Sequence, residues 1–135
     1  MKIKILIPIY NDWQSVHMLL SKIDAEVEGL NDEISVIIVN DSSTEVKNKF
    51  ELSLKNLKSV NIINMKENRG HARCNASGLK YINENYDFDY IIPMDGDGED
   101  RPEEIEELIS QIRSSNNRPI VGERVKRSEN LMFKI

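Results

Sequence analysis

The chain has 135 residues, of which 39% are hydrophobic and 30% charged, and its formal net charge is −5. This length suits one domain with a buried core, and the composition excludes a disordered chain or one that crosses a bilayer. The acidic balance argues against a nucleic-acid partner, and the single cysteine, Cys74, indicates a reducing compartment. We therefore expect one cytoplasmic domain.

Apolar runs of strand length alternate along the chain with segments of helical period. The expected strands are Lys2–Ile9, Ile34–Asn40, Val60–Met65, Tyr90–Met94 and Pro119–Gly122. Three of these runs are β-branched and apolar at consecutive positions, which indicates strands that are covered on both faces.

The first two expected helices follow the first two strands. One begins near Asp12, and its apolar face comprises Trp13, Val16, Leu20 and Ile23. The other follows "DSSTE", where Ser42 and Glu45 have the spacing of a capping box. Its expected apolar face comprises Val46, Phe50, Leu54 and Leu57.

The last two expected helices follow the third and fourth strands. The third opens at Gly70, runs to about Asn85 and carries small residues that favour close packing. The fourth has Pro102 in its first turn, with Asp100 and Glu103 as capping residues. Its buried stripe is expected at Ile105, Leu108, Ile109 and Ile112.

This alternation predicts an α/β fold with a mostly parallel sheet and helices on both faces. Ligands of such sheets bind beyond the carboxyl ends of the strands. The segments at those ends are "YND" (10–12), "DSS" (41–43), "ENRGH" (67–71) and "DGDGED" (95–100). All four are polar and three are acidic, so we expect them to form a binding site together.

The last of these segments is the most acidic. Glycines at 96 and 98 can adopt turn dihedrals, which would let Asp95 and Asp97 converge. Converged carboxylates repel unless a cation lies between them, and oxygen ligands on a short loop suit Mg²⁺ or Mn²⁺. The alternative is a solvated acidic turn before the next helix, the role that we assign to Asp100.

The other strand ends carry groups that suit a nucleotide. Asp41 is placed to accept hydrogen bonds from a base or ribose, with helix capping as the alternative. Arg69 and Gly70 precede a helix whose free N–H groups favour an anion such as phosphate, with a solvated arginine as the alternative. His71 is expected to be a polar surface or capping residue, with a catalytic role as the alternative. Pro8 cannot donate to a strand ladder, so the first strand should end near it.

A basic segment follows the last expected strand. It contains Arg124, Lys126 and Arg127, followed by apolar residues at 131–133. Two interpretations stay open: a solvated segment, or a surface that binds phosphates or the anionic headgroups of a membrane.

Five blocks of the sequence resemble a known family in their order and spacing. The blocks are "ILIPIYND", "VIIVNDSS", "ENRGHARCNASG", "DYIIPMDGDGEDRPEEI" and "VGERVKR". They resemble the N-terminal part of inverting family 2 glycosyltransferases of the GT-A fold, and are similar to the dolichol- and polyprenyl-phosphate sugar transferase branch. The resemblance implies a Rossmann-like nucleotide-binding fold over residues 1–135. It also implies sugar transfer from a UDP- or GDP-sugar to a polyprenyl-phosphate or saccharide acceptor of the cell envelope.

The resemblance implies roles for individual residues. The nucleotide-sugar would contact Pro8, Tyr10, Asp12, Asp41, Arg69, Gly70, Asp95 and Arg124. The Mg²⁺ or Mn²⁺ ion would bind Asp95 and Asp97, with Glu99 as a third ligand where the branch commonly has Gln. Two positions depart from the family pattern: Asp12 stands where Glu is more usual, and Arg101 replaces a proline.

Complete members of the family carry roughly as much chain again, which holds the acceptor-binding half. We therefore expect this chain to be the donor-binding part of a longer enzyme and to be inactive alone. An acceptor that is already an anion needs no strong base, and no residue is assigned as catalytic.

Two other classes of protein are alternatives to the glycosyltransferase. A phosphohydrolase with an Asp-x-Asp nucleophile would place that motif on the first strand, whereas here it follows the fourth. A non-catalytic nucleotide-binding or receiver-like signalling module is the other alternative, but a receiver needs a lysine after a late strand, and "PIVGER" lacks it.

Overall fold

The computed structural model describes residues 1–45, 54–96 and 102–114. In chain order the elements are β1 (Lys2–Ile9), α1 (Trp13–Glu26), β2 (Glu33–Asn40), β3 (Val60–Asn64), α2 (His71–Asn85), β4 (Tyr90–Pro93) and α3 (Glu104–Ser114). The first four expected strands are confirmed to within one residue at each end. The fifth, Pro119–Gly122, lies outside the described residues.

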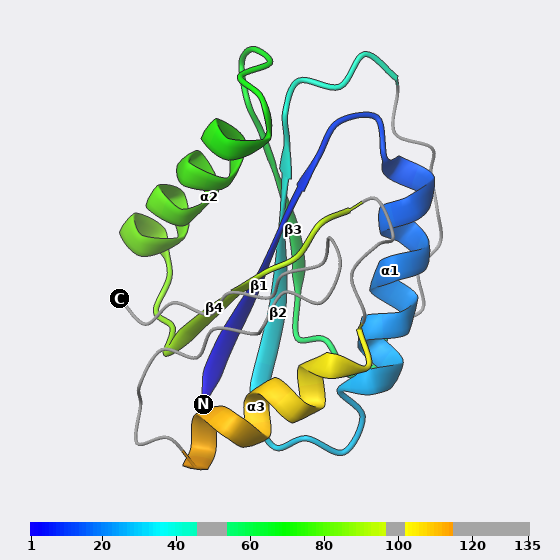
Figure 1. Ribbon diagram of the computed structural model, residues 1–135, viewed down its shortest axis with the longest axis vertical. Coiled ribbons are helices and arrows are strands. Elements are labelled where there is room, and N and C mark those ends of the chain that lie inside the picture. Colours follow the sequence, from blue (N-terminus) through cyan, green and yellow to red (C-terminus); the bar gives the residue numbers. More distant parts are fainter. Residues whose placement is uncertain (46–53, 97–101, 115–135) are drawn as a thin grey trace.

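The four strands form one parallel sheet in the order β3-β2-β1-β4 (Figure 1). Ile9 pairs with Asn40 and Asn40 with Asn64, so these three strands end at the same edge. The pairing of β1 with β4 stops at Leu6, and β1 continues past Pro8 to Ile9 because no β4 partner requires a donor there. The predicted parallel sheet is confirmed.

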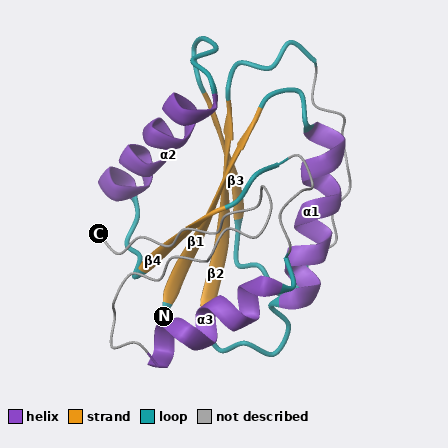
Figure 2. Ribbon diagram, viewed as in Figure 1, coloured by secondary structure: helices purple, strands orange, loops and turns teal. Residues whose placement is uncertain are grey.

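Helices cover both faces of the sheet (Figure 2). The odd-numbered isoleucines of β1, from Ile3 to Ile9, pack in one core with α1 and α3, whereas Leu6 packs in a second core with α2. This explains why the strands read as unbroken apolar runs: both alternating faces are buried. Among the described residues, no helix combines the length and the apolarity that crossing a bilayer requires.

Close packing of α2 on the sheet depends on Gly78. A Cβ atom there would lie 2.6 Å from Cδ1 of Leu6 and 2.8 Å from Cγ2 of Val39. The close approach expected from the small residues of this helix is therefore confirmed at Gly78. The predicted buried stripe of α3 is confirmed as well, since Ile105, Leu108, Ile109 and Ile112 are all buried.

The helix expected after "DSSTE" is wrong where it can be checked. Residues 46–53 lie outside the described part, but Leu54 and Leu57 belong to an irregular segment. The backbone N–H groups of residues 55, 56 and 57 donate to the carboxylate of Asp24 on α1, at 2.9 to 3.2 Å, instead of to helical carbonyls. Ser42 has φ +57° and caps no helix within the described residues.

Candidate functional site

The segments after β1 and β2 are fixed to each other by hydrogen bonds. Asn11, in the left-handed region at φ +60°, donates its N–H to Oγ of Ser43 at 2.9 Å. Its Oδ1 accepts the N–H of Glu45 at 2.9 Å, and the indole of Trp13 donates to the carbonyl of Glu45 at 3.2 Å. The sequence predicted that the segments 10–12 and 41–43 would meet but not these contacts, although asparagine at a strand end signals a left-handed turn.

Asp41 connects the segment after β2 to the loop before α2. Its carboxylate is 4% exposed, with Oδ1 accepting the N–H of Arg69 at 2.8 Å and Oδ2 that of Gly70 at 3.0 Å. Gly70 has φ +87°, which favours glycine, and is the N-cap of α2. Asp41 therefore accepts the backbone N–H groups of the loop in front of α2. The alternative, that Asp41 caps a helix after β2, is wrong.

Four of the predicted nucleotide-contacting residues share one pocket. A cavity of about 100 Å³ is lined by Pro8, Ile9, Tyr10, Asp12, Asp41, His71 and Cys74. The side chain of Asp12 accepts the N–H of Tyr10 at 3.4 Å, which turns the chain back over the strand end. The volume is below the 300–1,000 Å³ typical of pockets that enclose a whole ligand, so a nucleotide-sugar would insert only a part of itself here.

Cys74 also lines this pocket, and its thiol is unreactive. Burial, together with the negative charge of Asp41, raises the pKa of Cys74 to about 11. Its Sγ lies 3.5 Å from the carbonyl oxygen of Val39, and the residue is fully buried. A thiol in this state is neither a nucleophile nor a metal ligand at neutral pH.

His71, the first residue of α2, connects the pocket to the segment that follows β4. Nε2 of His71, in the first turn of α2, lies 3.1 Å from Oδ1 of Asp95. The sequence led us to expect a surface or capping role for His71. In the structure this residue lines the pocket and contacts the first carboxylate of the Asp-x-Asp motif.

Gly96 serves a different purpose from the one expected. Its φ is outside the left-handed region, so turn dihedrals are not what requires glycine here. A Cβ atom at this position would lie 2.7 Å from Cγ2 of Ile9 and 3.3 Å from the carbonyl oxygen of Pro8. Glycine is needed because the chain after β4 passes directly against the end of β1. Gly98 lies outside the described residues.

The proposed metal ligands are only partly covered by the structure. Asp97, Glu99 and Arg124 lie outside the described residues. Within the described ranges no group of three or more acidic, histidine or cysteine side chains could hold a metal ion. Mg²⁺ commonly uses one or two protein carboxylates together with substrate phosphates and waters. A carboxylate such as Asp95, in contact with His71 of the pocket, is the kind of ligand that such an ion uses.

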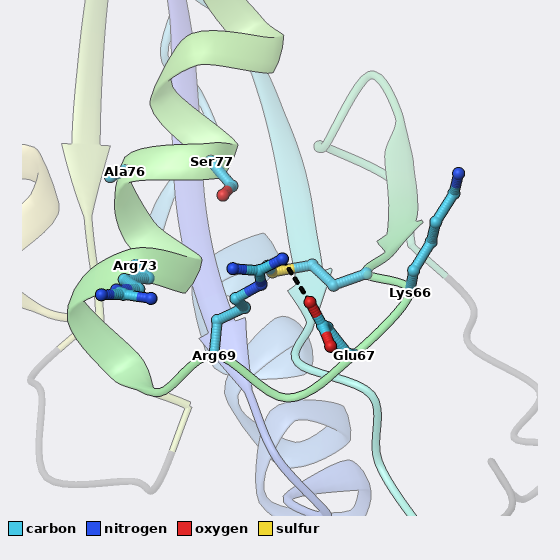
Figure 3. A pocket seen from close by; sticks show the side chains of 7 residues that line it. Lys66, Glu67, Arg69, Arg73, Ala76 and Ser77 are labelled. Atoms are coloured by element: carbon cyan, nitrogen blue, oxygen red, sulfur yellow. Dashed lines mark ion pairs between the residues drawn. The ribbon is translucent and has the colours of Figure 1, made fainter.

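The side chain of Arg69 lies apart from the pocket that Asp41 lines. It forms an ion pair with Glu67 in a separate groove of about 530 Å³ (Figure 3). The groove is lined by Met65, Lys66, Glu67, Arg69, Arg73, Ala76 and Ser77. Three cations face one carboxylate there, so the groove is net positive. The structure thus ties the backbone of Arg69 to Asp41 but directs its guanidinium elsewhere, and nucleotide contact by that guanidinium stays a prediction.

Solved structures with the same arrangement of elements identify the fold. Residues 1–349 of Staphylococcus aureus TarS, in complex with UDP, match 95% of this chain and 39% of TarS 1–349, with TM-score 0.65 and 19% identity. The mannosyltransferase PcManGT of Pyrobaculum calidifontis, in complex with GDP-Man and Mn²⁺, matches 70% of this chain and 27% of its own, with TM-score 0.53 and 19% identity. The fold is the Rossmann-like GT-A fold of glycosyltransferases.

The sequence places the chain within a family. The family model described as Glycosyl transferase family 2 matches residues 4–134, and the chain belongs to that family. The undecaprenyl-phosphate 4-deoxy-4-formamido-L-arabinose transferase of Photorhabdus laumondii is 27% identical over 135 residues, which are 98% of this chain and 40% of the relative. The dolichol-phosphate mannosyltransferase of Pyrococcus furiosus is 29% identical over 126 residues, 93% of this chain and 34% of the relative. The expected similarity to polyprenyl-phosphate sugar transferases is confirmed.

Proposed function

We propose that residues 1–135 form the donor-binding part of a glycosyltransferase that uses a UDP- or GDP-sugar. One observation carries this proposal: in a chain of this family, residues that follow β1, β2 and β3 line one pocket (Tyr10, Asp41 and His71), and Asp95 after β4 contacts His71. The names of the two relatives combine a sugar with undecaprenyl phosphate or dolichol phosphate. These names support a polyprenyl-phosphate or saccharide acceptor of the cell envelope.

In this proposal the nucleotide lies across the strand ends. Pro8, Tyr10 and Asp12 line its pocket, and Asp41 accepts from the base or ribose while holding the loop of Arg69 and Gly70. A carboxylate has about four lone-pair sites, so its two backbone hydrogen bonds leave capacity for a ligand hydroxyl. Arg124, after the last expected strand, would approach a phosphate.

The diphosphate would be held by a divalent cation on the Asp-x-Asp segment. Asp95, Asp97 and Glu99 are the proposed ligands of Mg²⁺ or Mn²⁺. When bound, the ion would neutralise the charge that develops on the leaving diphosphate. The solved complex of PcManGT with GDP-Man and Mn²⁺ supports this combination of ligands. An acceptor that is already a phosphate anion would attack the sugar carbon without a strong base and invert its configuration.

The acceptor site is proposed to lie largely outside this part of the enzyme. The chain spans 40% and 34% of the two polyprenyl-phosphate relatives. We expect the 135-residue chain to bind the donor weakly and to turn over little. Donor binding would take place on the cytoplasmic side, with the basic segment of Arg124, Lys126 and Arg127 placed for contact with an anionic membrane surface.

Calorimetric titration tests this proposal. UDP and GDP are titrated into the chain with and without Mn²⁺, using wild type and the double variant Asp95→Ala/Asp97→Ala. We expect binding of one nucleotide that Mn²⁺ strengthens, and loss of that strengthening in the double variant. Asp87→Ala is the matched control, because this exposed carboxylate pairs with Lys2 in β1, away from the pocket.

Equal affinity with and without Mn²⁺ would contradict the metal assignment. Release of inorganic phosphate from simple phosphomonoesters would instead favour the hydrolase alternative. That alternative is disfavoured by position, because the Asp-x-Asp motif follows β4 and not β1.

A further inference from the structure

We propose that His71 is a positioning residue for Asp95, a role that rests on the proposed metal-dependent donor site. Nε2 of His71 lies 3.1 Å from Oδ1 of Asp95, within hydrogen-bond distance. The contact joins two elements, the first turn of α2 and the residue that follows Met94 beyond β4. It is therefore a tertiary contact and not a consequence of local helix geometry.

The backbone on both sides of this contact is already fixed. On one side, Gly96 packs against Ile9 and Pro8 with no room for a Cβ atom, which sets the path of the chain next to Asp95. On the other side, the two backbone N–H groups before His71 donate to the buried Asp41. The His71–Asp95 contact acts on the side chain of Asp95 and restrains its torsions.

The Nδ2 atom of Asn75, four residues further along α2, lies 3.3 Å from the same Nε2 atom. Because Nδ2 is a donor, it can bond Nε2 only when Nε2 carries no proton, so the Asn75 contact and donation from Nε2 to Asp95 belong to different tautomers of His71. The side chains of His71 and Asp95 are 60% and 38% exposed, so a ligand can reach the pair, and His71 also lines the pocket.

The chemistry of the pair suits a metal-binding carboxylate. With its proton on Nε2, His71 donates to one lone pair of Oδ1, and a carboxylate has about four such sites. Asp95 can therefore accept from His71 and bind a cation at the same time. Outer hydrogen-bond partners of this kind orient a ligand, and their loss typically lowers metal affinity about 10- to 100-fold.

The test measures metal affinity directly and not turnover. Mn²⁺ is titrated into the 135-residue chain, alone and with saturating UDP or GDP, and free Mn²⁺ is read by electron paramagnetic resonance. We expect His71→Ala to weaken Mn²⁺ binding about 10- to 100-fold. Affinity for UDP or GDP without metal is measured in parallel, because His71 also lines the pocket, and the positioning role requires a loss of Mn²⁺ affinity in the absence of nucleotide as well.

Two further variants distinguish positioning from general damage to the fold. His71→Gln places an amide N–H near the position of Nε2 and should recover a large part of the Mn²⁺ affinity. Lys80→Ala, an exposed substitution on the same helix, should leave Mn²⁺ binding unchanged. Thermal melting of each variant checks that it is folded, and if His71→Ala does not fold, His71→Phe, which keeps a ring but has no N–H donor, takes its place and should weaken Mn²⁺ binding in the same way.

The outcomes separate this inference from the function on which it rests. If Asp95→Ala abolishes Mn²⁺ binding while His71→Ala has no effect or tightens it, the positioning role is wrong and the metal site stands. If Asp95→Ala has no effect, or if wild type binds no Mn²⁺ with or without nucleotide, both assignments fail.

Discussion

Asp24 and Asp41 are buried aspartates whose carboxylates both accept backbone N–H groups, at different places in the fold. Asp24 on α1 accepts backbone N–H groups from residues 55–57, and Asp41 after β2 accepts those of residues 69 and 70. Asp41 lines the pocket and Asp24 does not. The same interaction, a buried carboxylate that accepts backbone N–H groups, therefore stabilises only the fold at Asp24 and also shapes the site at Asp41.

The largest expected effect is on stability, at Asp24. Asp24→Ala should lower the free energy of unfolding by about 3 kcal/mol, because three backbone N–H groups and the Asn56 amide lose a charged acceptor. Urea denaturation measures this loss. Asp24→Asn keeps one acceptor oxygen and should lose less, whereas a loss below about 1 kcal/mol in Asp24→Ala would contradict the assignment.

Asp41→Ala should lose less stability and more binding. Two backbone N–H groups lose their acceptor, which corresponds to about 2 kcal/mol in the free energy of unfolding. The loop in front of α2 is released at the same time, so affinity for UDP or GDP should fall at least about tenfold, or about 1.4 kcal/mol. Asp24→Ala is the matched control and should keep wild-type affinity under conditions where it is folded. Equal losses of affinity in both variants would erase the distinction between the two carboxylates.

Acid sensitivity sharpens the comparison at Asp24. Burial opposes ionisation there, but hydrogen bonds from the backbone of Leu57, Asn56 and Lys55 outweigh it and hold the pKa of Asp24 below its ordinary value of 3.8. The unfolded chain then binds a proton more readily, so this stability is present above pH 3.8 and is lost as the pH falls through the lower pKa of the folded state.

Unfolding free energies measured from about pH 5 downward should therefore fall more steeply in wild type than in Asp24→Asn, since the variant lacks the titrating group. Parallel curves for the two proteins would show that the hydrogen bonds do not favour the ionised form.

The smallest expected effect is on the chemistry of Cys74. Its pKa of about 11 leaves roughly one thiol in a thousand ionised at pH 8, so native protein should react slowly with iodoacetamide and unfolded protein quickly. Asp41→Asn removes a neighbouring charge and should lower the pKa of Cys74, whereas Asp24→Asn should not. Mass spectrometry across a pH series gives the rates, and identical profiles for the two variants would contradict the role of Asp41.

The features that the sequence predicted well are those set by local pattern. The β-branched runs gave the four described strands, and Gly70 marked the start of α2, because periodicity and capping residues act over a few positions. The rule that ligands bind beyond parallel strands then located the pocket of Pro8, Tyr10, Asp12 and Asp41 before any contact was known.

The features that the sequence did not predict depend on partners distant along the chain. Leu54 and Leu57 have helical spacing, yet the backbone N–H groups of residues 55–57 donate to the carboxylate of Asp24, more than 30 residues earlier in the chain. Glycine is needed at position 96 because Ile9 lies against it, and His71 of α2 contacts Asp95 beyond β4. Nothing in the local pattern around these residues signals such contacts, so the fold must be known before their roles are visible.

The position of β1 between β2 and β4 has a consequence for the dynamics of the molecule. A strand with ladders on both sides opens only when the sheet itself opens, so its amide protons should be among the slowest to exchange with deuterium. The segment that carries Tyr10 and Asp12 continues directly from this strand. One wall of the pocket is thereby attached to the most persistent part of the chain, and ligand binding there should cost little ordering entropy.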